Sequence, residues 1–243
     1  GMAMKNILKI MLMMITIFTI AGSAVYAAEI PVSDQDQLIT SSDWTEISNL
    51  QDEMKKEEPD ATIDYDKALK VYVDCNLIKL QTADTKKLTS ALESANYVWV
   101  IPFKMEKTYG MFTVAKGLPL REEAKSVLTK AEQEEVKNHA GKWMITETAE
   151  HTVEPYYDIL LEKREALSDC TRVVLVGSQP GMRQPVALGM DDETARIWIS
   201  LGYQYPVMEK IPETQNVESG VYSFDSVAEI SDTYIEDSEV STG

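Results

Sequence analysis

Hydrophobic and polar positions in the middle of the chain alternate between a period of two and a helical period. The stretch KVYVDCNLIKL, which begins at Lys70, is rich in β-branched residues and predicts a strand. TADTKKLTSALESA then places Leu88, Ala91, Leu92 and Ala95 on one helical face. NYVWVIPF and MFTVAKG follow as two strands around a KTYG turn. These patterns predict a unit of strand, helix, strand and strand over residues 61–118.

A similar order returns after two predicted helices at 119–141. Thr129 and Glu132 fit a capping box at the start of the second helix, and Gly141 fits a left-handed stop after it. KWMITETAEH then predicts a strand. VEPYYDILLEKREALSDC predicts a helix whose inner side carries Tyr157, Leu160, Leu161 and Leu167. Three more strands are predicted at RVVLVG, PVALGMD and ARIWISL. The second unit covers residues 142–205.

This alternation predicts an α+β fold, with a mixed or antiparallel sheet and packed helices, in one globular domain over residues 61–210. The repeated order is consistent with an internal duplication and a cleft between its halves. Residue identity between the two units is poor, so a coincidental order of elements stays open.

Residues 1–27 have the three regions of a secretory signal peptide. Lys5 and Lys9 precede an apolar run from Ile10 to Ile20, and small residues lead to a cleavage point after Ala27. The alternative is a membrane anchor, for which this run is short, because a spanning helix needs about 20 apolar residues. We therefore expect an exported protein of bacterial type, extracellular or in the cell envelope, with no stable membrane span after cleavage.

The net charge of −17 lies mainly in the two flanks of the domain. The segment 28–60 holds ten acidic residues against two lysines, and the tail 211–243 holds eight acidic residues and no basic one. Such composition favours solvated chain, so we expect the first segment to be partly disordered and the tail largely so. Nucleic acid is not expected as a partner, because it attracts basic proteins.

Two cysteines, Cys75 and Cys170, lie in the domain. Outside the cell they can form a disulfide that closes a long loop. Unpaired cysteines are equally consistent with the sequence as buried thiols. The sequence leaves both alternatives open.

The stretch VVLVGSQPGMRQPVAL resembles the start of a phosphate-binding loop. Its glycines, Gly177 and Gly181, are one residue too close for that loop, and the lysine and hydroxyl that should follow are replaced by Met182 and Arg183. Pro180 and Gly181 instead suit the centre of a type II turn between antiparallel strands. Arg183 remains as a candidate ligand contact.

Trp198 and Arg196 are the other candidate ligand contacts. Strict alternation in ARIWISL puts both on the face opposite Ile197 and Ile199, with Gly189 of the preceding strand placed beneath the ring. An exposed tryptophan beside an arginine is a platform for a sugar or an anionic group. The more ordinary interpretation, which we favour, is that the ring packs beneath a helix.

Candidate catalytic groups are few. His139 lies at a predicted helix end and His151 in a polar connection, and no known catalytic or metal-binding motif surrounds either of them. Asp64 and Asp66, and the cluster at 191–193, are oxygen-rich but do not match a calcium loop.

The sequence therefore predicts a non-enzymatic binding or interaction module whose partner is a protein or a glycan outside the cell, with no cofactor, no metal and no catalytic residue assigned. The main alternative is a secreted hydrolase of cell-wall glycan or peptide that uses a carboxylate pair. A third alternative is a structural or assembly partner with a broad apolar patch.

Overall fold

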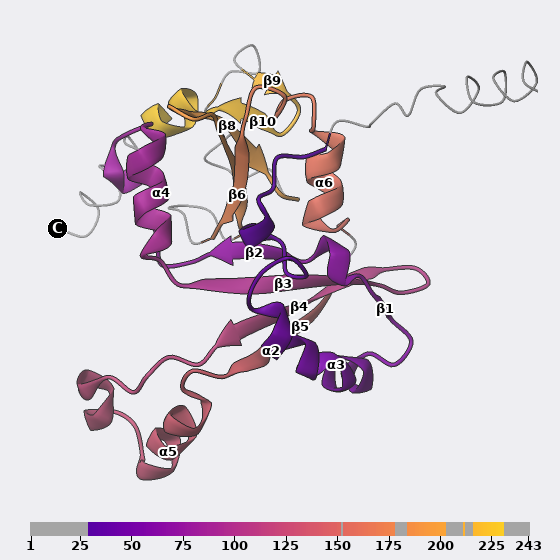
Figure 1. Cartoon of the computed structure of the whole chain (residues 1–243), viewed down its shortest axis with the longest axis vertical. Coiled ribbons are helices and arrows are strands. Elements are labelled where there is room, and N and C mark those ends of the chain that lie inside the picture. The colour runs from indigo at the N-terminus through magenta and orange to yellow at the C-terminus, as the bar shows by residue number, and fades with distance from the viewer. Residues whose placement is uncertain (1–28, 152, 178–183, 203–210, 212–215, 231–243) are drawn as a thin grey trace, which may run out of the picture.

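A single mixed sheet organises the protein (Figure 1). The computed structural model describes residues 29–151, 153–177, 184–202, 211 and 216–230. Their ten strands follow the order β5-β4-β3-β2-β6-β7-β8-β10-β9, and β1 pairs with β3 outside this path. The strands are β1 (Thr62–Ile63), β2 (Leu69–Tyr72), β3 (Tyr97–Lys104), β4 (Tyr109–Lys116), β5 (Trp143–His151), β6 (Arg172–Val176), β7 (Val186–Met190), β8 (Ala195–Ser200), β9 (Asn216–Glu218) and β10 (Val221–Ser223).

Short helices connect or cover these strands. They are α2 (Trp44–Ile47), α3 (Gln51–Glu57), α4 (Thr85–Glu93), α5 (Lys130–His139) and α6 (Tyr156–Glu162), with 3₁₀ turns η1 (Asp34–Asp36), η2 (Ser48–Leu50), η3 (Tyr65–Lys67), η4 (Ile78–Leu80) and η5 (Glu122–Ser126). The predicted α+β fold is confirmed. In the described part of the chain, none of the helices has both the length and the apolar character needed to span a lipid bilayer.

One parallel pairing joins two antiparallel halves of the sheet. Strand β2 runs parallel to β6, and the other pairings among the described strands are antiparallel. The two units have the predicted order of elements, β2-α4-β3-β4 and β5-α6-β6-β7-β8. However, β2 pairs directly with β3, whereas β5 lies at the sheet edge and is separated from β6 by three strands. The units therefore share an order along the chain but not an order in the sheet.

The face of the sheet that carries α4, here called the α4 face, is closed by apolar packing. The Asp84 side chain accepts a hydrogen bond from the Lys87 N–H at 3.1 Å and so caps α4. Leu88 and Leu92, one helical turn apart, are buried against the sheet together with the predicted neighbours Ala91 and Ala95. The helical face predicted from the sequence is therefore the one that packs.

The acidic segment 28–60 was expected to be partly disordered, but its described residues pack on the α4 face. Its apolar side chains at Leu38, Ile47 and Met54 are fully buried against β3 and β4. Burial of these side chains offsets the entropic cost of ordering the segment. The expectation of disorder was based on charge and did not include this burial. The segment is therefore part of the domain core.

The beginning of the acidic tail 211–243 also differs from the expected disorder. Strands β10 and β9 extend the sheet beyond β8, and residues 224–230 are helical. Val221, Tyr222, Phe224 and Val227 are each at most 3% exposed. These apolar residues complete the core, while residues 231–243 lie outside the described structure, as do residues 1–28, which include the expected signal peptide.

The opposite face, here called the α6 face, is covered over only part of its width. Leu160 of α6 and the following Leu167 are buried against β6, β7 and β8. On β4, the residues that point to the α4 face, such as Phe112 and Val114, are fully buried, whereas the alternate residues Met111 and Thr113 are only half-buried. The α6 face is therefore left partly open over β3, β4 and β5.

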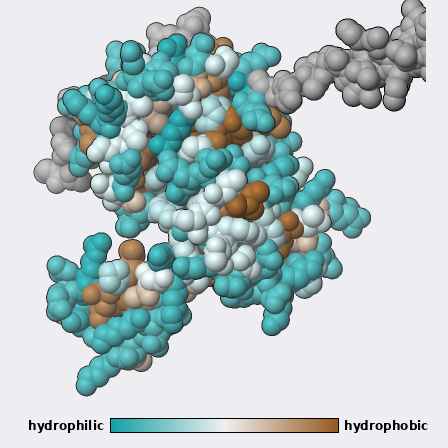
Figure 2. Space-filling model, in the orientation of Figure 1, coloured by the Kyte–Doolittle hydropathy of each residue, from teal (hydrophilic) through white to brown (hydrophobic). Residues whose placement is uncertain are grey.

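Residues 117–141 form an arm between β4 and β5 that projects from the sheet (Figure 1). Thr129 accepts a hydrogen bond from the Glu132 N–H at 3.2 Å, and Gly141 has a φ of 74°, so the predicted cap and stop of α5 are both confirmed. No residue of α5 is buried. Hydrophobic surface shows on the arm in Figure 2, where Leu118 is 48% and Val127 80% exposed.

Candidate functional site

A trough of about 360 Å³ occupies the open part of the α6 face. Its floor crosses four adjacent strands, and nearly all of the floor side chains are apolar. They are Val71, Val73, Val98, Val100, Met111, Thr113 and Ala149. Val153 and Tyr156, at the start of α6, form one wall, and Gly177, Gln184 and Pro185 form another. This volume falls within the roughly 300–1,000 Å³ that is typical of small-molecule sites.

The sheet register explains why these side chains share one surface. Val100 pairs with Thr113 across β3 and β4, and Thr113 pairs with Glu147 across β4 and β5. Paired residues in neighbouring strands point to the same side, so Glu147 joins the rim of the trough. The next acid along β5, Glu150, pairs with Gly110 and points to the α4 face.

His151 brings a hydrogen-bond acceptor to the trough. Its Nδ1 lies 3.2 Å from the carbonyl oxygen of Val153, which can only accept, so Nδ1 carries the proton. In the neutral imidazole the other nitrogen, Nε2, then presents a lone pair. Nε2 is buried and has no hydrogen-bond partner in the described structure. His151 therefore lines the trough and has one enclosed ring nitrogen without a partner in the described structure.

The electrostatic character of the trough is negative. Burial and then the charge of Glu147 raise the pKa of Tyr156 to about 12, so Tyr156 keeps its proton near a carboxylate. Among the described lining residues there is a carboxylate at Glu147 and no lysine or arginine. A ligand of this site consequently meets an apolar floor and a polar rim that includes the carboxylate of Glu147.

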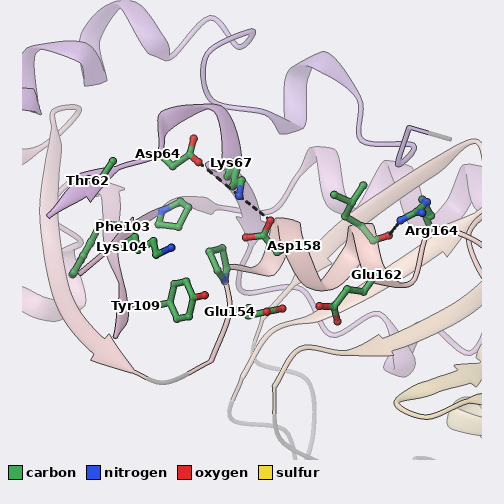
Figure 3. Close-up of a pocket in the computed structure, with 13 residues that line it drawn as sticks. Thr62, Asp64, Lys67, Phe103, Lys104, Tyr109, Glu154, Asp158, Glu162 and Arg164 are labelled. Atoms are coloured by element: carbon green, nitrogen blue, oxygen red, sulfur yellow. Dashed lines mark hydrogen bonds and ion pairs between the residues drawn. The ribbon is translucent and has the colours of Figure 1, made fainter. Parts of the chain in front are cut away.

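A second recess, of about 480 Å³, lies beside α6 and is lined mainly by charged groups (Figure 3). The Lys67 ammonium donates to Asp158 at 2.8 Å and lies 3.8 Å from Asp64. Arg164 donates to the Leu161 carbonyl oxygen at 2.9 Å. Because these charges already have partners, an incoming ligand would have to compete with existing contacts.

Two carboxyl groups meet at the edge of this recess. Glu162 lies close enough to Glu154 to raise the pKa of Glu154. Both side chains are exposed to solvent and approach each other in Figure 3. The recess therefore contains two neighbouring acids, and the pKa of one of them, Glu154, is raised.

The tryptophan platform predicted from the sequence is wrong. Trp198 is fully buried, and its ring lies 6.3 Å from the ring of Phe224 on the α4 face. The register between β7 and β8 shifts after Gly189, so Arg196 is an extra residue and does not share the Trp198 face. Arg196 instead pairs with Asp191 at 3.1 Å. The packing interpretation of Trp198 agrees with the structure.

The other predicted ligand contact, Arg183, lies outside the described residues. The disulfide alternative is also wrong, because Cys75 packs on the α4 face and Cys170 on the α6 face, so the sheet separates them. Cys170 is buried beneath Gly189, and burial raises the pKa of its thiol to about 11.

The acidic turns have structural roles in the described part of the chain. Asp191 accepts the N–H groups of Glu193 and Thr194 at 2.8 and 2.7 Å, and these bonds together with Arg196 lower its pKa. No group of three or more His, Cys, Asp or Glu side chains among the described residues is placed to hold a metal ion. His139 ends α5 on the arm and lines a recess there, whereas His151 lines the trough.

A buried charged cluster on the α4 face is a structural element and not a site. Asp36, only 2% exposed, accepts hydrogen bonds from Ser33 and Tyr72 at 2.8 Å each. Arg172 donates to both of its carboxylate oxygens, at 3.0 and 3.3 Å. Every oxygen of Asp36 is therefore satisfied within the fold.

Comparison with known proteins adds no functional information: no family model, curated protein or solved structure matches this chain. The trough must therefore be judged on its own chemistry.

Proposed function

We propose that this protein is a non-enzymatic binding module that acts outside the cell and that the trough on the α6 face is its ligand site. The observation that carries this proposal is an apolar floor that crosses four strands and leaves side chains such as Val98, Met111 and Ala149 partly exposed. Elsewhere α4, α6 and the N-terminal segment cover the sheet. An apolar surface left in contact with water and rimmed by polar groups is typical of a binding site.

The lining favours an apolar ligand over the glycan that the sequence suggested. Sugar recognition commonly uses an exposed aromatic ring, and Trp198 does not supply one because it is buried. Tyr156 is the one aromatic side chain among the described lining residues of the trough. The signal-like sequence of residues 1–27 supports the proposed location.

The test is binding of an uncharged apolar probe, 1-octanol, followed by NMR shifts of the methyl groups of Val98, Val100 and Met111. We expect saturable shifts in these methyls and little change at Val217, which is 55% exposed at a distant edge. Shifts that are absent, or equally large at Val217, contradict the proposal.

A matched pair of substitutions separates the trough from general hydrophobicity. Met111→Glu places a charge on the half-buried floor, and we expect it to abolish the octanol shifts. Leu80→Glu makes the same chemical change at a side chain that is 45% exposed outside the trough. Unchanged octanol binding in Met111→Glu, with both variants folded by circular dichroism, contradicts the site assignment.

A second candidate function is hydrolysis by the Glu154 and Glu162 pair, which the raised pKa of Glu154 supports. Glycosidases hold their two carboxyl groups about 5–9.5 Å apart, so that water or a sugar carbon lies between them. Glu154 and Glu162 are instead both exposed to solvent at the edge of the recess. We expect no turnover of chromogenic glycosides or of casein by the wild-type protein. Turnover that Glu154→Gln abolishes would establish the enzyme instead.

A further inference from the structure

We propose that the ligand of the trough is a small molecule with an apolar body and a cationic amine as its head group. This inference rests on the proposed function and adds the chemistry of the head group. The apolar floor selects the body, and the polar groups at the β5 end of the trough select the head.

The first argument is that the trough offers acceptors where a ligand head would lie. His151 lines the trough, and its enclosed Nε2 has no described partner; in the neutral ring that is protonated at Nδ1, a ligand that reaches Nε2 and donates a hydrogen bond satisfies it. A buried acceptor left unsatisfied costs free energy, and a bound donor removes that cost. An ammonium group donates three hydrogen bonds and accepts none.

The second argument is the sign of the charge. Glu147 lies on the trough rim, and its proximity to Tyr156 is reflected in the raised pKa of that phenol. Glu147 is the one ionised carboxylate among the described lining residues. A carboxylate head group would be repelled here, whereas an ammonium head group would be attracted.

The third argument is orientation. Glu147, Ala149 and His151 alternate along β5, so the acceptors lie at one side of the trough, while Val71 and Val73 lie across it. An amphipathic amine can therefore place its head on β5 and its body over β2 and β3. The volume of about 360 Å³ suits a small molecule better than a folded partner.

The experiment compares three probes with the same eight-carbon chain: octylamine in its ammonium form, 1-octanol and octanoate. Dissociation constants come from the methyl shifts of Val98, Val100 and Met111. We expect octylammonium to bind roughly three- to tenfold more tightly than 1-octanol. This gain in affinity is larger than that from an exposed ion pair and smaller than that from a buried charge-assisted hydrogen bond. Octanoate should bind most weakly of the three.

Two acids on β5 supply the matched variants. Glu147→Gln should bring the octylammonium and octanol affinities to nearly the same value. Glu150→Gln removes the same charge from the opposite face of the same strand and should leave the preference intact. Because the whole chain carries a net charge of −17, this control distinguishes the local carboxylate from general attraction of cations.

The possible outcomes separate the two proposals. Equal binding of octylammonium and 1-octanol by the wild type overturns the amine inference and leaves the apolar site standing. An equal loss of preference in Glu147→Gln and Glu150→Gln also overturns it, because the attraction is then nonspecific. If no probe binds in the trough, both the proposed function and this inference fail.

Discussion

At the scale of single residues, the role of Trp198 depends on one extra residue in its strand. Because the register shifts between β7 and β8, Trp198 and Arg196 point to different sides. The ring then faces the core beneath α4 and Phe224. The alternating sequence pattern alone predicts that Trp198 can be exposed, but in the structure Trp198 packs in the core.

This placement predicts that Trp198→Ala destabilises the fold without a specific effect on ligand binding. We expect a loss of about 3–5 kcal/mol in the free energy of unfolding, the usual cost of deleting a buried aromatic side chain. Trp198→Phe should lose less, because the indole Nε1 has no hydrogen-bond partner in the described structure. Urea denaturation measures both losses. Arg196→Ala, which breaks an exposed ion pair, is the control and should leave the midpoint of urea denaturation almost unchanged. An equal effect of Trp198→Ala and Arg196→Ala contradicts this account.

The features that could be predicted at this scale are those that depend on neighbours in sequence. The Thr129 cap and the positive φ of Gly141 follow from local chemistry and were predicted correctly. The trough residues Met111, Glu147 and Tyr156 were missed, because their meeting depends on the register of β3, β4 and β5 and on where α6 stops covering the sheet. The signal available in the sequence was the mixed apolar and polar alternation of TETAEH, which indicates a half-exposed strand face.

At the scale of elements, composition was a poor guide to order. The N-terminal segment is strongly acidic, yet it buries apolar side chains such as Ile47 and Met54. Asp43 precedes α2 and accepts hydrogen bonds from Tyr97 at 2.7 Å and from Trp99 at 3.0 Å. A charge count treats all positions alike, whereas folding depends on a few apolar positions that reach the core. The arm is the opposite case, since its two helices were predicted but bury little.

The arm should therefore be removable. The Gly117 N–H donates to the Lys142 carbonyl oxygen at 2.9 Å. Gly117 and Lys142 therefore form the neck of the arm, where its two ends are hydrogen-bonded to each other. Replacing residues 118–141 with Asn-Gly supplies a two-residue turn at this neck. We expect a cooperative unfolding transition and a loss of no more than about 2 kcal/mol, caused by exposure of part of Trp143. Thermal denaturation by circular dichroism measures it, and loss of the cooperative transition would show that the arm is part of the core.

At the scale of the whole molecule, the connection between the two halves of the sheet is short. The parallel pairing of β2 with β6 involves two residue pairs, Val71 with Leu175 and Tyr72 with Val176. The antiparallel pairing of β3 with β4, by comparison, extends over both strands. Asp36 lies over this short connection and bonds to Tyr72 of β2 and to Arg172 of β6. The N-terminal segment thus links the two halves as well as covering one of them.

This arrangement predicts that Asp36→Ala is among the most destabilising single changes at a polar residue. The substitution leaves the mostly buried guanidinium of Arg172 and the hydroxyl of Tyr72 without their acceptor, so we expect a loss of about 3–5 kcal/mol in the free energy of unfolding. Asp34→Ala removes the same charge from an exposed position two residues away and is the control. Urea denaturation followed by tryptophan fluorescence measures both.

A double variant tests the pairing directly. Arg172 destabilises the fold mainly when it is unpaired, so Asp36→Ala combined with Arg172→Met should lose less free energy of unfolding than the sum of the two single changes. Additive losses, or equal midpoints for Asp36→Ala and Asp34→Ala, would mean that the two halves are held together by the apolar core alone.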